Sequence, residues 1–514
     1  MKKVLFPILA LSLVLAMASA TIPVQAADEA DIQTSIDDGV AWLVAEQYPD
    51  GSWGYAGAAT TGFAVVKLED LAFERGMSPF DPAYEYSANV TAGLDYIFGN
   101  AVTDGCGLHF GTGHETYTTG IAMMAIAASK DMSRIVSMGN PVVDGMTYGQ
   151  VLQAFVDYFA CAQNPDGGWR YWYMPERSDQ SNTGYAILGL KYAETAGIDI
   201  PQTLKDNLSS WIDLIQDDVN GDVNDGGSGY DNMVFEVWGI NKDDDGDGLI
   251  DEDTQDGLDN DGDGSIDEDP GPTWINLLKT GHLLFEMEFV GDNLATQRVQ
   301  DAIDYIERHW EDADWDPGWK GPFGSLDQPH MQAAYLLMKG FEAFNIQAIE
   351  VSGSAIDWFD EMADAIIGSQ IYGGPMGDGY WPQDYWGGAV LATEWALLAL
   401  ERVVPPLDVV IDIKPWSDPN SINLKNKGVI PVAILTTDEF DAAMVDPDTV
   451  LFAGAMPVHF ALEDVDNDGD MDMILHFNTQ ETDIMPGDTE ATLTAQIYDG
   501  KAFFGTDSVR TIPK

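Results

Sequence analysis

Two segments of this chain share one pattern: Gln47-Tyr48-Pro49-Asp50-Gly51-Ser52-Trp53 and Gln163-Asn164-Pro165-Asp166-Gly167-Gly168-Trp169. Each segment begins a loop rich in Gly, Asp and aromatic residues. An amphipathic stretch with apolar residues at helical spacing precedes the loop, and a more apolar stretch rich in small residues follows it. The pattern therefore predicts a repeated unit of helix, loop and helix.

The same unit recurs along the chain, giving six copies in all. The amphipathic first helices are expected at residues 32–47, 86–100, 148–164, 204–219, 296–310 and 355–371. The second helices are expected to begin near residues 60, 118, 182, 273, 328 and 386. Thr and Asn near several of these starts suit helix N-caps, and helices this apolar suit the inside of an assembly. Six inner and six outer helices can close into a ring.

The motif Gln-x-x-x-Gly-x-Trp, present at residues 47–53 and 163–169, resembles the QW motif of the squalene cyclase and prenyltransferase β-subunit family. The resemblance covers about residues 30–404. It implies a mainly α fold, an (α/α)6 toroid of six helical hairpins, in which the QW motif ties outer helices together. It leaves the chemistry open, because one fold hosts many functions.

The catalytic residues of that family are incomplete in this chain. The Asp-x-Asp-Asp acid of the protonating cyclases is absent from the start of every expected inner helix. Asp104-Gly105-Cys106 resembles the first part of the zinc site of the protein prenyltransferases, but Asn182 occupies the place of the family's later His. His109 and His114 could complete a different site, and the alternative is a structural turn with a buried thiol. We do not expect a zinc site, and we leave open whether the protein is an enzyme.

A working pocket in such a ring should lie at the N-terminal ends of the inner helices, where helix dipoles and loops converge. The pocket candidates for general acid or base chemistry are Glu115, Asp179, His330 and Asp384. The alternative interpretation is that these residues are solvated caps of helix ends.

Three aspartate-rich loops carry the sharpest chemical signal. In each loop Asp occupies positions 1, 3, 5 and 9 and Gly occupies position 6, which surrounds Ca²⁺ with hard oxygens at a tight turn. The expected ligands are Asp243, Asp245, Asp247 and Asp251, then Asp259, Asp261, Asp263 and Asp267, then Asp464, Asp466, Asp468 and Asp472. The first two loops form an insertion at 241–270, between the fourth outer and inner helices.

These loops are EF-hand-like but lack the bidentate Glu of an EF-hand, because position 12 is Thr254, Pro270 or Leu475. They look more like the calcium loops of thrombospondin type-3 and dockerin-type repeats. That resemblance implies structural calcium bound with an affinity on the order of 0.1 to 1 mM.

After Pro405-Pro406 the sequence changes to short alternating apolar runs at 409–413, 429–434 and 473–477. We therefore expect a separate β-sandwich-like domain over 405–514, with the third calcium loop between two strands. The stretch from Ile411 to Leu435 resembles an accessory module found at the ends of secreted bacterial and archaeal proteins. That resemblance supplies no catalytic residues.

The N-terminus predicts export. Residues 1–26 read as a signal peptide, in which Lys2 and Lys3 precede an apolar run and small residues precede the expected cleavage after Ala26. No second long apolar segment follows, so we expect a secreted protein without a membrane anchor. In that compartment Cys106 and Cys161 could form a disulfide or remain two buried thiols.

The charge balance constrains the partners. The chain has 86 Asp and Glu against 23 Lys and Arg, a net charge of −63. Such a chain repels nucleic acid and anionic membrane surfaces and attracts cations.

Two functions remain open. One is an extracellular or cell-surface binding or scaffold module that binds calcium and a glycan, lipid or protein ligand. The other is a secreted enzyme that uses the toroid cavity on a terpenoid, glycan or peptide. The incomplete catalytic residues favour the first.

Overall fold

The structure is a computed structural model. It describes residues 29–55, 57–111, 113–172, 177–217, 223–231, 272, 274–312, 318–320, 328–383, 387–401, 407–417, 419–437, 440–466, 469–482, 484–487, 489–497 and 502–512. The expected signal peptide, the calcium insertion at 241–270, Asp384 and Asp468 lie outside the described residues. The chain divides into two compact units, Met1–Phe341 with Gln347–Leu400 and Glu401–Lys514 with Glu342–Ile346. We call them the helical unit and the β unit.

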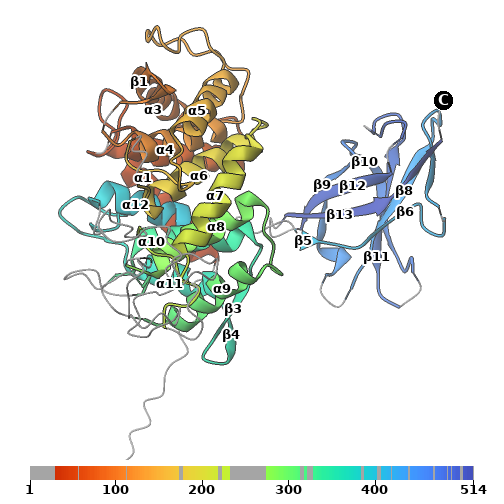
Figure 1. Ribbon diagram of the computed structural model, residues 1–514. Helices are drawn as coiled ribbons and strands as arrows, with labels where there is room; N and C mark the ends of the chain where they lie inside the picture. The colour runs from red at the N-terminus through yellow and green to blue at the C-terminus, as the bar shows by residue number, and fades with distance from the viewer. Residues whose placement is uncertain are drawn as a thin grey trace, which may run out of the picture. The chain divides into compact units, whose positions relative to one another are not determined.

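The described part of the helical unit contains twelve α-helices (Figure 1). They are α1 (Glu29–Ala45), α2 (Ala58–Glu74), α3 (Ser87–Gly99), α4 (Glu115–Ala128), α5 (Tyr148–Ala162), α6 (Gln180–Thr195), α7 (Gln202–Ile215), α8 (Leu277–Val290), α9 (Gln297–His309), α10 (Met331–Ala343), α11 (Trp358–Gly368) and α12 (Ala389–Ala399). The odd-numbered helices lie where the repeat predicts its amphipathic helices. The sixth of them begins later than expected, because Asp357 caps α11 by accepting hydrogen bonds from the backbone N–H groups of Phe359 and Asp360.

Two short hairpins interrupt the helical alternation. β1 (Ala101–Asp104) and β2 (Gly107–Phe110) follow α3, and β3 (Ala348–Val351) and β4 (Ser354–Asp357) follow α10. No described helix combines the length and the apolar character needed to cross a bilayer.

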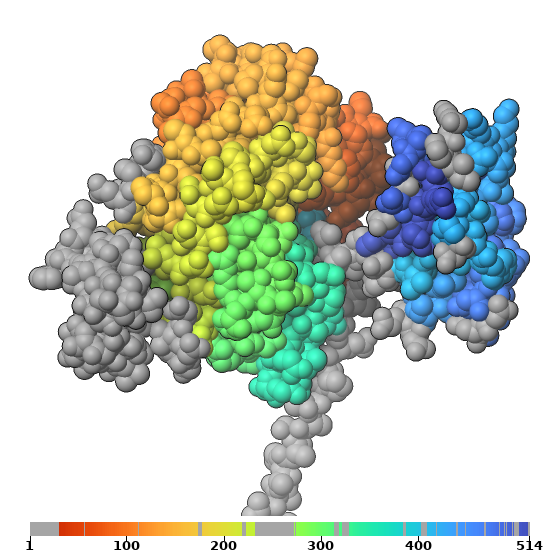
Figure 2. Space-filling view, turned by 45° about the vertical axis from the view of Figure 1, so that its right-hand side comes forward, coloured from red at the N-terminus to blue at the C-terminus, as the bar shows by residue number. Residues whose placement is uncertain are grey.

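The even-numbered helices are buried and pack closely on one another, because small residues lie at their contacts. A Cβ atom added to Gly62 of α2 would lie 2.7 Å from Ile121 Cγ2 of α4, and one on Gly120 of α4 would lie 2.2 Å from the Tyr185 carbonyl oxygen of α6. Larger side chains would force these helices apart. The helix α12 also packs on α1 and α2, so the last helix lies beside the first two. The surface colour in Figure 2 runs in order from orange to yellow to green, as successive hairpins lie side by side.

Glutamine side chains at the ends of outer helices join neighbouring hairpins. Gln47 Nε2 donates to the Asn89 carbonyl oxygen of α3 at 3.1 Å, and Gln163 Nε2 donates to the Leu204 carbonyl oxygen of α7 at 3.0 Å. Each Nε2 also donates to the motif glycine in its own loop. The motif therefore ties outer helices together here, as its resemblance implied.

Two further glutamines make the same bonds although the sequence pattern did not reveal them. Gln216 Nε2 donates to the Arg298 carbonyl oxygen of α9 at 2.8 Å. Gln370 Nε2 donates to the Ser35 carbonyl oxygen of α1 at 2.9 Å. The second bond joins the last hairpin to the first helix of the unit.

Three buried tryptophans, Trp53, Trp169 and Trp381, fix the loops onto the helices. Each donates its backbone N–H, at 3.0 Å, to a threonine on the following inner helix: Thr61, Thr183 and Thr393. Each indole N–H donates to a carbonyl oxygen of the preceding outer helix: Leu43, Phe159 and Ile366. The loop between the two helices of a hairpin is therefore held from both sides.

The described residues of the β unit form two four-stranded sheets, in the orders β10-β11-β8-β6 and β5-β13-β12-β9, and a two-stranded pair β14-β7. The strands are β5 (Leu407–Asp408), β6 (Ile411–Ile413), β7 (Ser421–Asn423), β8 (Val429–Ile434), β9 (Val445–Phe452), β10 (Pro457–Glu463), β11 (Asp472–Asn478), β12 (Glu490–Ile497), β13 (Ala502–Ser508) and β14 (Arg510–Ile512). One buried core joins the two sheets, with the rings of Phe452 and Phe477 at 5.2 Å. The expected strands at 409–413, 429–434 and 473–477 correspond to β6, β8 and β11.

Candidate functional site

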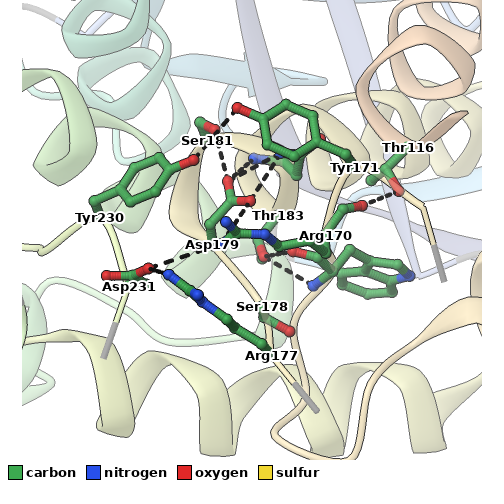
Figure 3. Close-up of polar contacts among 12 residues, drawn as sticks. Thr116, Arg170, Tyr171, Arg177, Ser178, Asp179, Ser181, Thr183, Tyr230 and Asp231 are labelled. Carbon is green, nitrogen blue, oxygen red and sulfur yellow. Dashed lines mark hydrogen bonds and ion pairs between the residues drawn. The ribbon is translucent and has the colours of Figure 1, made fainter. Parts of the chain in front are cut away.

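A network of charged side chains lies at the N-terminal end of α6 (Figure 3). Arg170 Nη1 lies 3.4 Å from Asp179 Oδ2 and 3.7 Å from Asp231 Oδ2. Arg177 Nη2 donates to Asp231 Oδ2 at 2.6 Å. Both aspartates are buried, and the two arginines are largely covered. Two cations and two anions therefore balance each other, which offsets the cost of removing them from water.

Asp179, one of the pocket candidates, is the N-cap of α6. Its Oδ1 accepts hydrogen bonds from the Asn182 backbone N–H at 2.9 Å and from Ser181 Oγ at 2.6 Å, and its Oδ2 accepts from Asn182 Nδ2 at 2.9 Å. Burial raises the pKa of Asp179, and the bond from Ser181 and the charge of Arg170 oppose that rise. Both oxygens already have donors within the protein, so the residue acts as a structural cap.

Four aromatic side chains that contact one another in succession lie beside this network, and we call them the aromatic row: Trp172, Tyr171, Tyr230 and Trp274. The rings of Trp172 and Tyr171 lie 6.3 Å apart, the two tyrosine hydroxyls 3.3 Å apart, and the rings of Tyr230 and Trp274 6.0 Å apart. The Arg170 guanidinium lies within 6 Å of both tyrosine rings. The tryptophans at the ends are exposed, by 46% for Trp172 and 70% for Trp274. The row therefore presents two indole rings to solvent beside a covered charged network.

The first turns of two inner helices position the aromatic row. The Thr116 backbone N–H of α4 donates to the Tyr171 carbonyl oxygen at 3.2 Å, and the Gln180 backbone N–H of α6 donates to the Tyr230 carbonyl oxygen at 2.7 Å. These N–H groups belong to the set that a helix leaves unpaired at its start. Trp274 has φ +54°, an uncommon conformation for a residue with a side chain. The backbone thus fixes each part of the row locally.

The remaining pocket candidates lie on other helix ends. Glu115 is the first residue of α4, and its Oε2 is buried with no hydrogen-bond partner among the described residues. His330 is buried and precedes α10, where its Nδ1 accepts from the Ala333 backbone N–H at 3.2 Å. The structure thus places Glu115, Asp179 and His330 at the starts of three different inner helices.

Below the aromatic row, the inner helices pack aromatic rings on one another. The Phe63 ring of α2 lies 5.9 Å from the rings of Tyr185 in α6 and Tyr335 in α10, and 6.4 Å from that of Trp395 in α12. None of the four is more than 6% exposed. These four side chains therefore form part of the buried core between the inner helices.

A second candidate site is the loop between β10 and β11. One side-chain oxygen each of Asp464, Asp466 and Asp472 lies within 4.8 Å of the others. Gly469 has φ +106°, the left-handed conformation that the tight turn of a calcium loop requires. These residues fit a Ca²⁺ ion, which takes several carboxylate oxygens at 2.3 to 2.6 Å.

Asp472 fixes this loop to the sheet. It is fully buried, and its Oδ1 accepts from the Thr436 backbone N–H while its Oδ2 accepts from the Val465 backbone N–H, both at 2.8 Å. Each oxygen retains a second lone pair for a cation. Asp472, the ninth residue of the loop pattern, therefore holds the loop against the neighbouring backbone.

Cys106 and Cys161 form a disulfide, with Cα atoms 5.4 Å apart, an ordinary separation. It joins the β1–β2 turn to α5. The Cys106 sulfur is therefore unavailable as a zinc thiolate in this form. His109 stacks on Tyr158 with ring centres 4.7 Å apart. The two open interpretations of the cysteines resolve in favour of the bridge.

Sequence reasoning missed the arginines and tyrosines of the network. A signal was present, because the second QW motif runs directly into Trp169-Arg170-Tyr171-Trp172. An arginine among consecutive aromatic residues at a loop is typical of binding surfaces. Trp274 of the row does follow from the sequence, because it lies at the expected start of an inner helix.

No family model and no curated protein matches this chain. Among solved structures, it is similar to the type II terpene cyclase MstE from Scytonema (11% identity, 73% of this chain and 99% of that chain, TM-score 0.42). It is also similar to an α-1,6-mannanase from Salegentibacter (10%, 72% and 97%, TM-score 0.44) and to a family 76 mannosidase from Bacteroides thetaiotaomicron (11%, 73% and 98%, TM-score 0.43). Similarity at this level says nothing about what this chain binds or catalyses.

Proposed function

We propose that this chain is a secreted, calcium-binding extracellular binding protein. Its helical unit forms a closed (α/α)6 toroid that binds a glycan at the aromatic row. The observation that carries the proposal is the pair of exposed indoles, Trp172 and Trp274, on either side of a covered charged network. Indole faces pack on the C–H faces of sugar rings, while tyrosine hydroxyls and arginine bond to sugar hydroxyls.

The site favours binding over catalysis. A glycosidase needs two carboxyl groups facing the same bond. Asp179 is covered and has donors on both oxygens, while Asp231 accepts from Arg177. The helix-end candidates Glu115 and His330 belong to other hairpins. The alternative of a secreted enzyme therefore lacks an assembled pair among the described residues.

The closed toroid is supported by the bonds between successive hairpins. The Gln370 bond to Ser35 joins the last hairpin to the first helix, and α12 packs on α2. A ring gives the aromatic row a fixed base, because the loops that carry it are held by helices on both sides.

The binding proposal is tested by titrating the full chain with soluble polysaccharides of different charge and linkage and measuring affinity. W172A and W274A should each weaken binding roughly tenfold, the loss of about 1.4 kcal/mol expected for a central aromatic contact. W416A is the matched control, because Trp416 of the β unit is 77% exposed and lies outside the row.

Equal binding by wild type, W172A and W274A would refute the aromatic row as the site. Cleaved or rearranged sugar products, lost in D179N but kept in W416A, would replace the binding function by an enzymatic one.

Separate observations support the proposal that the β unit binds calcium. The converging oxygens of Asp464, Asp466 and Asp472 and the turn at Gly469 agree with the ligand spacing in the sequence. The two other calcium loops, at 243–251 and 259–267, remain predictions from the sequence. A structural role suits loops without an EF-hand's last ligand.

A further inference from the structure

Two histidines of the β unit lie side by side on adjacent strands. The register pairs His459 of β10 directly with His476 of β11, and the centres of their rings are 4.4 Å apart with 26° between the ring planes. Directly opposed residues in an antiparallel pair have side chains on the same face of the sheet. Both imidazoles therefore project from the same face of the β10–β11 hairpin.

We propose that His459 and His476 form a two-imidazole binding site for a divalent first-row transition-metal ion such as Zn²⁺. Imidazole nitrogen lies about 2.0 to 2.1 Å from zinc, so two imidazoles that share one tetrahedral ion place their ring centres about 5 Å apart. The observed ring separation is close to that value, and binding requires the stacked rings to turn about their side-chain torsions until one nitrogen of each points at the common ion. Water or a substrate group completes the coordination.

The nitrogen atoms of the pair are suited to this task. The Nδ1 of His476 is buried and has no hydrogen-bond partner among the described residues. Burial, and next to it the neighbouring His459, lowers the pKa of His476. Imidazole binds a metal through a nitrogen that carries no proton, and the Nδ1 of His476 has no competing hydrogen bond among the described residues.

The electrostatic surroundings of the two histidines favour a cation, but the ligand atoms differ from those of a calcium site. The chain has a net charge of −63, and the carboxylate of Glu463 acts on His476 electrostatically. Nitrogen ligands select zinc, copper or nickel, whereas calcium prefers oxygen. The site is thus distinct from the loop of Asp464, Asp466 and Asp472.

The experiment is a calorimetric titration of the full chain with Zn²⁺ in a large excess of Ca²⁺, so that carboxylate sites are occupied. We expect one equivalent of Zn²⁺ to bind even when Ca²⁺ is in large excess. H459Q and H476Q should each weaken it at least about tenfold, because one of two protein ligands is lost. His459 is exposed, so H459Q tests the site without disturbing the core.

The matched control is H114Q, because His114 is an exposed histidine of the helical unit, and it should bind Zn²⁺ as wild type does. A Cu²⁺ titration read by electron paramagnetic resonance should show coupling to imidazole nitrogen that both β-unit variants reduce. Zn²⁺ binding that is absent in excess calcium, or that H459Q leaves unchanged, would overturn the proposal. An equal loss of Zn²⁺ binding in H114Q would also overturn the proposal.

Discussion

At the scale of single residues, the interior of the helical unit contains buried carboxyl groups that form no salt bridge with any described residue. Glu394 of α12 is fully buried, and neither of its carboxylate oxygens has a hydrogen-bond partner among the described residues. Burial raises its pKa well above the ordinary value, as it does for Glu69 and Glu286. An apolar environment disfavours the charged form, so these groups are protonated over a wider pH range than in water.

This shift makes stability depend on pH in a defined direction. The folded-state pKa of Glu394 lies above the unfolded value of about 4.3. Its contribution is therefore complete below that value and is lost as the pH rises through the folded-state pKa. The variant E394Q cannot ionise, so its melting temperature should rise relative to wild type between about pH 5 and pH 9. Thermal unfolding across that range measures the difference.

The control for this prediction is E481Q, in which an exposed glutamate of the β unit is neutralised. Its difference from wild type should not grow with pH in the same range. A constant offset between E394Q and wild type would show that Glu394 does not ionise on unfolding as proposed.

Single residues also mark the limit of what the sequence predicted about the site. Asp179 was named as a candidate from its place near an inner helix, and that place is correct. The alternative interpretation as a helix cap is correct for Asp179, but the side chain is buried and not solvated, because it lies against Ser181, Asn182 and Arg170, whose arrangement no linear spacing encodes. Tyr230 reaches the site from a different hairpin, so its pairing with Tyr171 required the fold.

At the scale of elements, outer helices were predictable because their apolar residues recur with helical period and because glycines and prolines separate them. The hydrogen bonds by which Gln216 and Gln370 join neighbouring hairpins were not predictable. Gln216 and Gln370 lie farther from their glycines than Gln47 does, because their loops contain more residues, which short β-bridges of Gln216 with Ser228 and of Ile371 with Tyr380 hold together. The bonds survive although the motif spacing does not.

The tie at Gln370 should be measurable. Its Nε2 donates to the carbonyl oxygens of Ser35 and Gly379, both at 2.9 Å, and its Oε1 accepts from Ser35 Oγ at 2.6 Å. The variant Q370A removes these three buried hydrogen bonds and leaves the Ser35 hydroxyl without its acceptor, so we expect it to lower the free energy of unfolding by about 1 to 3 kcal/mol. Denaturant unfolding of the full chain provides the measurement.

Q33A is the companion variant, since Gln33 is exposed on α1 and bonds Asp37 within its own helix. It should change stability by no more than about 0.5 kcal/mol. If Q370A were as mild as Q33A, the bond between the last hairpin and the first helix would not stabilise the unit.

At the scale of the whole molecule, the net charge of −63 sets the conditions for stability. Self-repulsion of so many carboxylates opposes the compact state, and bound divalent cations relieve it where the carboxylates converge. Asp464, Asp466 and Asp472 are such a place in the β unit. The division into a helical and a strand-rich part was visible in the sequence as a change of apolar period, and the three calcium loops stay predictions from the spacing of their aspartates.

Calcium removal tests this argument. A chelator should lower the melting temperature of the full chain, and Ca²⁺ should restore it, because the ion binds the folded loops only. Equilibrium dialysis of D464N should show about one Ca²⁺ fewer per chain than wild type. E481Q also loses one carboxylate in the β unit, outside the loop, and should retain the wild-type stoichiometry. Identical melting with and without chelator would contradict structural calcium.

The bond that joins Gln370 to Ser35 has a consequence for how the chain acquires its structure. These partners are 335 residues apart in sequence, so the first helix cannot complete its contacts until the sixth hairpin exists. In open helical arrays, each repeat can add to a growing end, and folding can stop and resume along the chain. Here the entropy of a very long loop must be lost before the closing contacts form, which slows the final step. Synthesis that ended after the fifth hairpin would therefore leave two unmatched apolar faces, and such a fragment would be prone to aggregate.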